Sequence, residues 1–195
     1  MISIIKKIKI KVLENVKKRQ FNKYSVWGEG TKFEYTSGCQ NGSGSAKNIM
    51  IGKNCMIRGL ISTCGNGTII IGDRSYVGGG ARIGSVHSIK IGNDVIIAGN
   101  THIYDNNNHP TDPTERLKMT QSGDFFGELW SWKKADNKPI VIEDNVWVGE
   151  QCVILKGVKI GKGAIVGCNS VVTHDVPEYT IVAGNPAKVV KYLSH

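Results

Sequence analysis

The sequence predicts an all-β protein that winds into a parallel β-helix, a solenoid with a triangular cross-section. Three observations predict it. Aliphatic residues recur at every sixth position, glycine supplies 24 of the 195 residues, which is about 12% against a typical ~7%, and one long insertion interrupts the period. Neither a 3.6-residue helix nor a two-residue strand produces a period of six, whereas hexapeptide repeats are typical of parallel β-helices.

The first 23 residues form a basic segment. They hold eight of the 25 Lys and Arg residues and one of the 16 acidic residues, which leaves 17 basic and 15 acidic groups for the other 172 residues. A nearly neutral body offers no broad surface for tracking phosphates. We therefore expect no nucleic-acid partner, despite the formal net charge of +9.

Two local structures fit this segment. Ile5, Ile8, Val12 and Val16 have the spacing of one helix face, whereas Ile8, Ile10 and Val12 alternate as in a strand. We separate residues 1–30, a basic segment of helix or strand, from a β-helix domain over residues 31–195. The segment either packs on its own protein or a neighbouring subunit, or makes peripheral contact with an anionic membrane surface.

The cysteines and histidines predict neither disulfides nor a metal. Five cysteines are an odd number without a C-x-x-C pair, so neither a disulfide framework nor a zinc site fits, and a reducing cytoplasm is expected. His87, His102, His174 and His195 lack metal-ligand spacing. No apolar run approaches the ~20 residues of a membrane span, so the expected location is the cytoplasm, at most peripheral at the inner face of the membrane.

The period of six defines the coil. We expect about three rungs over residues 49–104 and about two and a half over residues 140–187, each strand turning one aliphatic side chain inward. Phase slips of two residues in the first part predict enlarged corners. The recurring aliphatic residues are Ile51, Ile57, Ile71, Val77, Ile83, Ile91, Ile97, Ile103, Ile142, Val148, Ile154, Ile160, Val166 and Val172.

The period is absent from the insertion, residues 104–139, which we interpret as a functional excursion loop. Aromatic rings with polar groups suit a carbohydrate, because its C–H faces stack on rings while its hydroxyls need polar partners. Alternatively, the aromatic residues pin the loop to its own prism or to a neighbouring subunit. The candidate acceptor-binding residues are Tyr104, Asp105, Asp112, Arg116, Trp130 and Trp132.

Three stretches of the sequence carry a resemblance to a known family. They are the aliphatic period, the segment HIYDNNNHPTDP with Arg116 downstream, and the run from Pro139 to Lys191, which contains NVWVG, SVVTHDV and AGNPAK. Over residues 49–191 the chain resembles the left-handed β-helix hexapeptide-repeat acyltransferases, of the sugar and polysaccharide O-acetyltransferase type. Galactoside and maltose acetyltransferases are similar in these stretches.

This resemblance implies a homotrimer with active sites between adjacent prisms and acetyl-CoA as co-substrate. His109, in the segment Asn108-His109-Pro110, matches the family's histidine and is implied to be the general base for direct transfer to a sugar hydroxyl. Asp105 and Asp112 are the acids nearest to it in sequence. The positions implied to bind the cofactor are Trp147, Gly149, Glu150, Cys168, Thr173, His174, Lys188 and Lys191.

The chain also departs from the galactoside-type pattern. Glu150 stands where those enzymes carry serine, and His174 where they carry lysine. Gly78 and Val86 stand about where their acceptor-binding Asn and Asp fall, so we do not expect galactoside transfer. We expect instead a capsule, O-antigen or other surface glycan. The alternatives are a xenobiotic acetyltransferase, one acting on serine or an amino sugar, and a non-catalytic solenoid that serves as a binding module.

Overall fold

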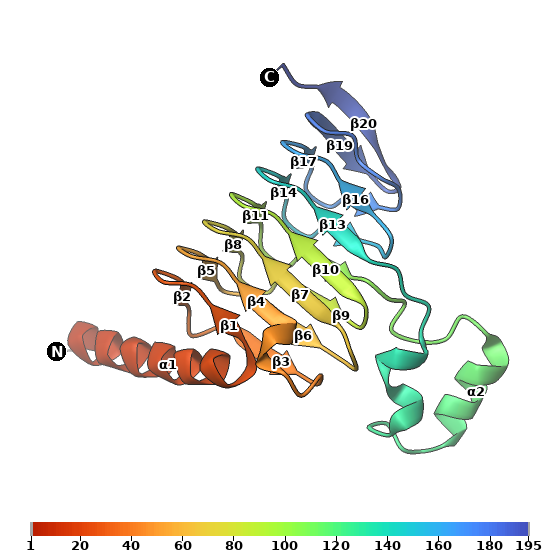
Figure 1. Ribbon diagram of the computed structural model, residues 1–195, viewed down its shortest axis with the longest axis horizontal. Helices are drawn as coiled ribbons and strands as arrows, with labels where there is room; N and C mark the ends of the chain where they lie inside the picture. Colours follow the sequence, from red (N-terminus) through yellow and green to blue (C-terminus); the bar gives the residue numbers. More distant parts are fainter. Residues whose placement is uncertain (1, 195) are drawn as a thin grey trace.

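The computed structural model describes the backbone of residues 2–194 and the side chains from residue 8 to residue 194. A long helix, α1 (Ile2–Tyr24), precedes a prism of three β-sheets, and an excursion leaves the prism between β12 and β13 (Figure 1). The expected all-β architecture is thus correct for the prism, and residues 2–24 of the basic segment form a helix, whereas residues 26–27 already form the first strand of the prism. Among the described residues, no helix combines the length and the apolar character that a membrane crossing needs.

The prism has one sheet on each of its three sides, which we call sheets A, B and C. Sheet A consists of β1 (Val26–Trp27), β4 (Ile49–Ile51), β7 (Thr68–Ile71), β10 (Ser88–Ile91), β13 (Ile140–Ile142) and β16 (Lys159–Ile160). Sheet B consists of β2 (Lys32–Phe33), β5 (Met56–Ile57), β8 (Tyr76–Val77), β11 (Ile96–Ile97), β14 (Trp147–Val148), β17 (Ile165–Val166), β19 (Thr180–Gly184) and β20 (Ala187–Tyr192). Sheet C consists of β3 (Gly38–Asn41), β6 (Leu60–Thr63), β9 (Arg82–Ser85), β12 (His102–Tyr104), β15 (Val153–Ile154) and β18 (Val171–Val172).

The predicted sixfold period is confirmed as the column of inward side chains. Ile71, Ile91 and Ile142 stack in register along sheet A, and each is at most 1% exposed. Neighbouring strands are parallel throughout, except in the terminal pair β19–β20. One hexapeptide buries only its inward side chain, so stability comes from stacking successive rungs.

The phase slips enlarge the corner between sheets C and A, although the corner between sheets B and C is also shortened once, to four residues from Ile57 to Ile61. At the corner between sheets C and A the chain takes eight residues from Ile83 to Ile91, whereas it takes six from Ile154 to Ile160 at the same corner two rungs later. The excursion occupies this corner too, between Ile103 and Ile142. The insertion therefore enlarges a corner that is already widened in the preceding rung.

The corner between sheets A and B shows why the sequence places Asn, Asp and Gly beside the aliphatic residues. Asn54, Arg74, Asp94 and Asn145 occupy this corner in successive rungs, with φ between 55° and 58°. Asn and Asp tolerate this left-handed conformation better than most other residues. Arg74 is the exception, and its guanidinium pairs with the Asp94 carboxylate of the next rung at 2.6 Å.

The N-terminal end of the core is closed by α1. Phe21 is fully buried and stacks on Phe33, with 3.9 Å between ring centroids. The Ser25 hydroxyl and backbone N–H both donate to the Phe21 carbonyl, which ends the helix against β1. The last turns of α1 therefore belong to the prism.

Candidate active site

The buried carboxylate of Asp105 anchors the start of the excursion. This residue is 0% exposed and accepts hydrogen bonds from the Ser85 hydroxyl at 2.6 Å and from the backbone N–H groups of Val86 and His87, both at 2.9 Å. Asn106 adds a fourth donor at 3.1 Å. Asp105 therefore holds the start of the excursion to the neighbouring rung, and both of its carboxylate oxygens already accept hydrogen bonds.

His109 lies on the first turn of the excursion. Asn108, with φ 62°, reverses the chain before it, and the His109 N–H donates to the Asn107 carbonyl at 2.7 Å. The exposed imidazole meets the edge of the Trp130 indole, with 5.5 Å between centroids and 84° between planes. Trp130 is itself held by a 3.1 Å hydrogen bond from its Nε1 to the Met119 carbonyl.

The segment after His109 is fixed by Arg116 and Asp112. One guanidinium nitrogen of Arg116 donates to the carbonyls of Pro110 and Thr111, at 3.1 and 2.5 Å. Asp112 caps α2 (Pro113–Gln121) by accepting the N–H groups at positions 114 and 115. These N–H groups lower the pKa of the Asp112 carboxyl. Both predicted acceptor residues therefore shape the backbone that carries His109.

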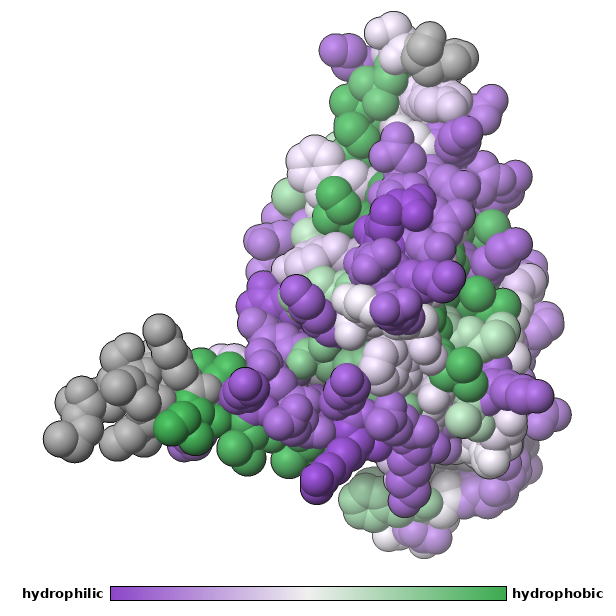
Figure 2. Space-filling model, turned by 60° about the vertical axis from the view of Figure 1, so that its left-hand side comes forward, coloured by the Kyte–Doolittle hydropathy of each residue, from purple (hydrophilic) through white to green (hydrophobic). Residues whose placement is uncertain are grey.

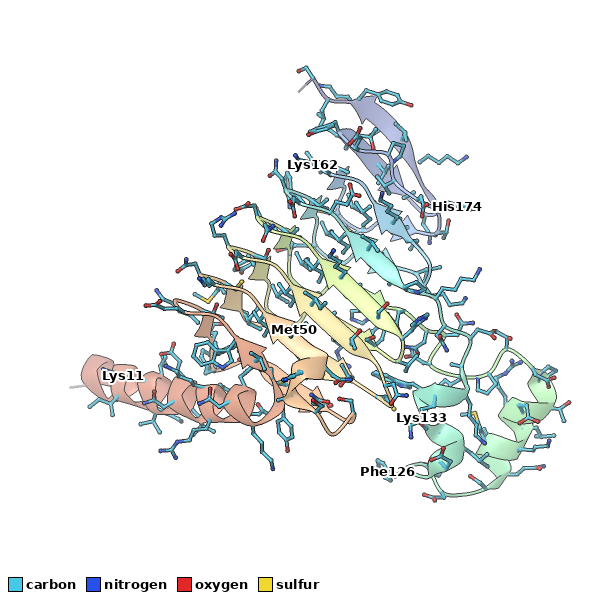
Figure 3. All side chains as sticks on the ribbon, in the orientation of Figure 1. Lys11, Met50, Phe126, Lys133, Lys162 and His174 are labelled. Atoms are coloured by element: carbon cyan, nitrogen blue, oxygen red, sulfur yellow. The ribbon has the colours of Figure 1, made fainter. Side chains whose placement is uncertain are left out.

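Two further aromatic residues pin the excursion to its own prism. Tyr104 and Trp132 meet edge to face, with 5.5 Å between centroids. Gly84 leaves room for them, since a Cβ there would lie 2.4 Å from the Tyr104 ring and 3.1 Å from Trp132. Burial raises the pKa of the Tyr104 hydroxyl. Lys133 also reaches back from the excursion toward the corner at Gly65, whereas Phe126 stands fully exposed at its tip (Figure 3).

His109 opens onto a groove of about 450 Å³ between the excursion and the outer face of sheet C. Tyr104 and Arg116 line it, whereas Asp105, Asp112, Trp130 and Trp132 are not among its lining residues. His102 and Asn108 are among the lining residues that the sequence reasoning missed. His102 could have been found, because it alternates with the buried Ile103 and so faces outward beside Tyr104.

The turn before His109 holds a buried acceptor, the side-chain oxygen of Asn108. This Oδ1 atom has no hydrogen-bond partner within the part of the chain that the structure describes. A buried polar atom ordinarily has a partner, because leaving it unpaired costs free energy. This acceptor belongs to the turn that carries His109 and is shielded from solvent.

The first group of predicted cofactor residues meets at the corner between sheets B and C. Trp147 is 48% exposed on the outer face of β14. A Cβ at Gly149 would lie 2.7 Å from the backbone nitrogen of Cys168, so the two corners are in close contact. The Asn169 N–H donates to the Glu150 carbonyl at 2.9 Å, which aligns Glu150 with the exposed Cys168 of the next rung.

The remaining cofactor positions form two other groups. The Thr173 hydroxyl and His174 Nδ1 lie 2.8 Å apart, just after β18. Figure 3 shows His174 at the C-terminal end of the prism, far from the tip of the excursion at Phe126. Lys188 and Lys191 are exposed on β20, and Lys188 pairs with Ala183 of β19.

The two halves of the predicted site lie on different faces of one chain. Trp147 projects from sheet B, whereas the groove at His109 is bounded by Val153, Ile154 and Leu155 on sheet C. Among the residues that the structure describes, no cluster of three or more His, Cys, Asp or Glu side chains could hold a metal ion.

Two family models match the repeats of this chain. Residues 139–174 match "Bacterial transferase hexapeptide (six repeats)", and residues 68–105 match "Hexapeptide repeat of succinyl-transferase". The putative acetyltransferase YJL218W of Saccharomyces cerevisiae is 32% identical over 155 residues, which cover 73% of this chain and 71% of that protein. The chain belongs to the hexapeptide-repeat transferase family.

Other members of the family match over less of their length. The putative lipopolysaccharide biosynthesis O-acetyl transferase WbbJ of Escherichia coli is 34% identical over 131 residues, 67% of this chain and 64% of WbbJ. A chloramphenicol acetyltransferase of Klebsiella aerogenes is 41% identical over 111 residues, 56% of this chain and 50% of that enzyme. The chain thus spans less than two thirds of the length of these two curated relatives.

Solved structures share the fold. A point mutant of the N-acyltransferase AntD from Bacillus cereus, in complex with dTDP-4-amino-4,6-dideoxyglucose and coenzyme A, superposes with a TM-score of 0.69 at 19% identity over 91% of this chain and 89% of AntD. The hexapeptide-repeat containing acetyltransferase VCA0836 from Vibrio cholerae gives 0.56 at 25% identity, over 96% of this chain and 94% of its own. The three parallel sheets, the repeat and these neighbours fit a left-handed β-helix.

Proposed function

We propose that this chain is an acetyl-CoA-dependent O-acetyltransferase that acetylates a hydroxyl of a sugar or surface glycan. The observation that carries the proposal is the position of His109. Its imidazole is exposed at the mouth of a groove and is held by Trp130, on a turn that Arg116 fixes. A base held in this way can reach a bound hydroxyl without rearrangement of the loop.

His109 acts as the general base. An imidazole can accept a proton at neutral pH, where a sugar hydroxyl is a weak nucleophile. As the sugar hydroxyl loses its proton to the imidazole, its oxygen attacks the thioester carbonyl. A backbone N–H at the corner between sheets B and C stabilises the resulting oxyanion. The C–S bond then breaks, the thiolate takes the proton from the imidazolium, and the acetyl ester is released. No covalent acyl-enzyme is needed.

The corner between sheets B and C suits coenzyme A. The exposed Trp147 indole offers a flat apolar surface, and the exposed Cys168, next to Gly149, offers backbone groups to an extended pantetheine arm. Lys188 and Lys191 on β20 supply positive charge for its phosphates. Bound acetyl-CoA supplies the activated acyl group.

The active protein is a homotrimer in this proposal. Because Trp147 and His109 lie on different faces of one prism, a thioester held at Trp147 would reach the histidine of a neighbouring copy. This arrangement is the one that the resemblance to sugar O-acetyltransferases implies. Five free cysteines fit a reducing compartment, the cytoplasm.

Polar groups in the groove favour a hydroxyl-bearing acceptor. Among the residues that line the groove, Tyr104 offers a ring and Arg116 offers N–H donors to a sugar. The similarity to WbbJ supports a surface glycan. The similarity to a chloramphenicol acetyltransferase favours a second candidate, a xenobiotic acceptor.

Thiol release from acetyl-CoA, followed by mass spectrometry of the acceptor, tests the proposal. We expect acetylated product from at least one member of a panel of surface-glycan oligosaccharides, and none from galactosides. Product from chloramphenicol alone would assign the second candidate. If the protein does not bind acetyl-CoA, the acetyltransferase proposal fails and the alternative of a non-catalytic binding module remains.

A further inference from the structure

Helix α1 has two parts with different surroundings. Its C-terminal turns pack on β1, β2 and β3 through Phe21, which is 0% exposed. Its N-terminal part extends beyond the end of the prism, on the side opposite the excursion in the view of Figure 1. This projecting part is not needed to close the core.

The outward face of α1 is apolar. Ile8, Val12 and Val16 are 59%, 55% and 52% exposed, and their spacing of four residues places them on one side of the helix. Val12 and Phe21 are nine residues apart, which at 3.6 residues per turn puts them on opposite sides. Figure 2 shows this exposed apolar stretch along the projecting helix.

The same face is positively charged. Lys9 and Arg19 are exposed, and the helical repeat puts them on the side of Val12. The acidic residue of this stretch, Glu14, is half-buried and instead lines a hollow between α1 and sheet B, together with Lys32 and Arg58. Within the described side chains, the outward face therefore combines three aliphatic groups with cations and carries no carboxylate.

We propose that this outward face, defined by Ile8, Lys9, Val12, Val16 and Arg19, docks on the surface of an anionic lipid bilayer. Aliphatic side chains on such a helix enter the boundary between headgroups and acyl chains, while the cations meet lipid phosphates. A second α1 would bring the same positive charge, so the face is poorly suited to pair with its own copy. The inference rests on α1 alone and does not depend on the proposed chemistry.

Flotation of the full chain with vesicles tests the inference. We expect the protein to float with vesicles of phosphatidylcholine containing phosphatidylglycerol, and not with phosphatidylcholine alone. Raising the salt concentration should weaken the association, because screening shortens the range of exposed charges. Absence of binding to the anionic vesicles at low salt would overturn the proposal.

Matched variants assign any binding to the outward face. Lys9→Glu/Arg19→Glu should reduce partitioning at least about tenfold, and Val12→Asp/Val16→Asp should abolish it. Lys47→Glu/Lys90→Glu makes the same change of charge at two exposed lysines of the prism and should retain most of the binding. Equal loss in this control would contradict docking through α1. A change of oligomeric state in the Val12 and Val16 variant, with vesicle binding intact, would assign the face to a second copy instead. Far-UV circular dichroism checks that each variant is folded.

Discussion

The imidazole of His109 stands edge-on to the indole of Trp130, with 5.5 Å between ring centroids and an angle of 84° between planes. The two residues are 21 positions apart, one before and one after α2. Trp130 also bonds the end of α2 through the Met119 carbonyl. The excursion therefore forms one packed unit around the proposed base.

Replacing Trp130 by alanine should lower the turnover number about 10- to 100-fold, because the imidazole loses its lateral support and small misplacements are costly in catalysis. The KM for acetyl-CoA should change little, since Trp130 packs against His109 and the end of α2, whereas Trp147 projects from sheet B. Steady-state kinetics separate the two parameters. Trp130→Phe keeps a ring and should recover most of the turnover; equal kinetics for all three proteins would refute a positioning role.

The substitution Asp105→Asn should lower the free energy of unfolding by about 1–3 kcal/mol. One carboxylate oxygen becomes an NH2 group that faces the N–H and O–H donors of residues 85–87. Urea denaturation measures the effect. The matched control is Asp136→Asn, which alters an exposed carboxylate that accepts a hydroxyl hydrogen bond from Thr111 and should stay within about 0.5 kcal/mol. Similar losses of unfolding free energy in both variants would argue against a stabilising role for the buried Asp105 carboxylate.

Alkylation should distinguish the cysteines of the native protein. Iodoacetamide should modify the exposed Cys168 and spare Cys39, because burial raises the pKa of the Cys39 thiol to about 12 and keeps it protonated. Coenzyme A should slow labelling at Cys168 if it binds the corner between sheets B and C. Peptide mass spectrometry with and without coenzyme A measures both effects. Unchanged labelling of Cys168 at saturating coenzyme A would place the cofactor elsewhere.

The first turn of α2 should weaken in acid. Hydrogen bonds from the N–H groups at positions 115 and 114 lower the pKa of Asp112 in the folded protein, so its contribution is present above the ordinary aspartate pKa of about 3.9. It is lost as the pH falls through the lowered folded value. Amide exchange across residues 113–121 reports the change. Asp112→Asn keeps a capping oxygen without a titrating group and should remove the acid dependence; the same dependence in that variant would assign it to another residue.

The sequence predicted a β-helix domain from residue 31 but traced its rungs only from residue 49, so the first rung was not placed. Trp27, Phe33 and Cys39 occupy the inward positions there, in register with Ile51, Ile57 and Ile61. They keep the spacing of six, but none of them is Ile, Leu or Val. A search for aliphatic residues at every sixth position therefore does not find them. The aromatic residues suit the end of the prism, where Phe21 of α1 stacks on Phe33.

Some residues of the candidate groove could be predicted from the sequence, whereas the packing of the excursion around them could not. His109, Tyr104 and Arg116 were expected and share the groove. Ser85 and Asp105 are 20 residues apart, which is the length of a rung in this part of the coil, so their contact could have been derived once the rung was known. The packing of Trp130 and Trp132 could not, because it depends on the path of an insertion that has no repeat.

The most direct test of the account compares His109→Ala with the unchanged protein at saturating acetyl-CoA and a glycan acceptor that the panel identifies. The account predicts a rate of acetyl transfer about 10²- to 10⁴-fold lower, with an affinity for coenzyme A, measured by calorimetry, that stays the same. Transfer by the variant at the rate of the unchanged protein would remove the imidazole from the reaction and contradict the account.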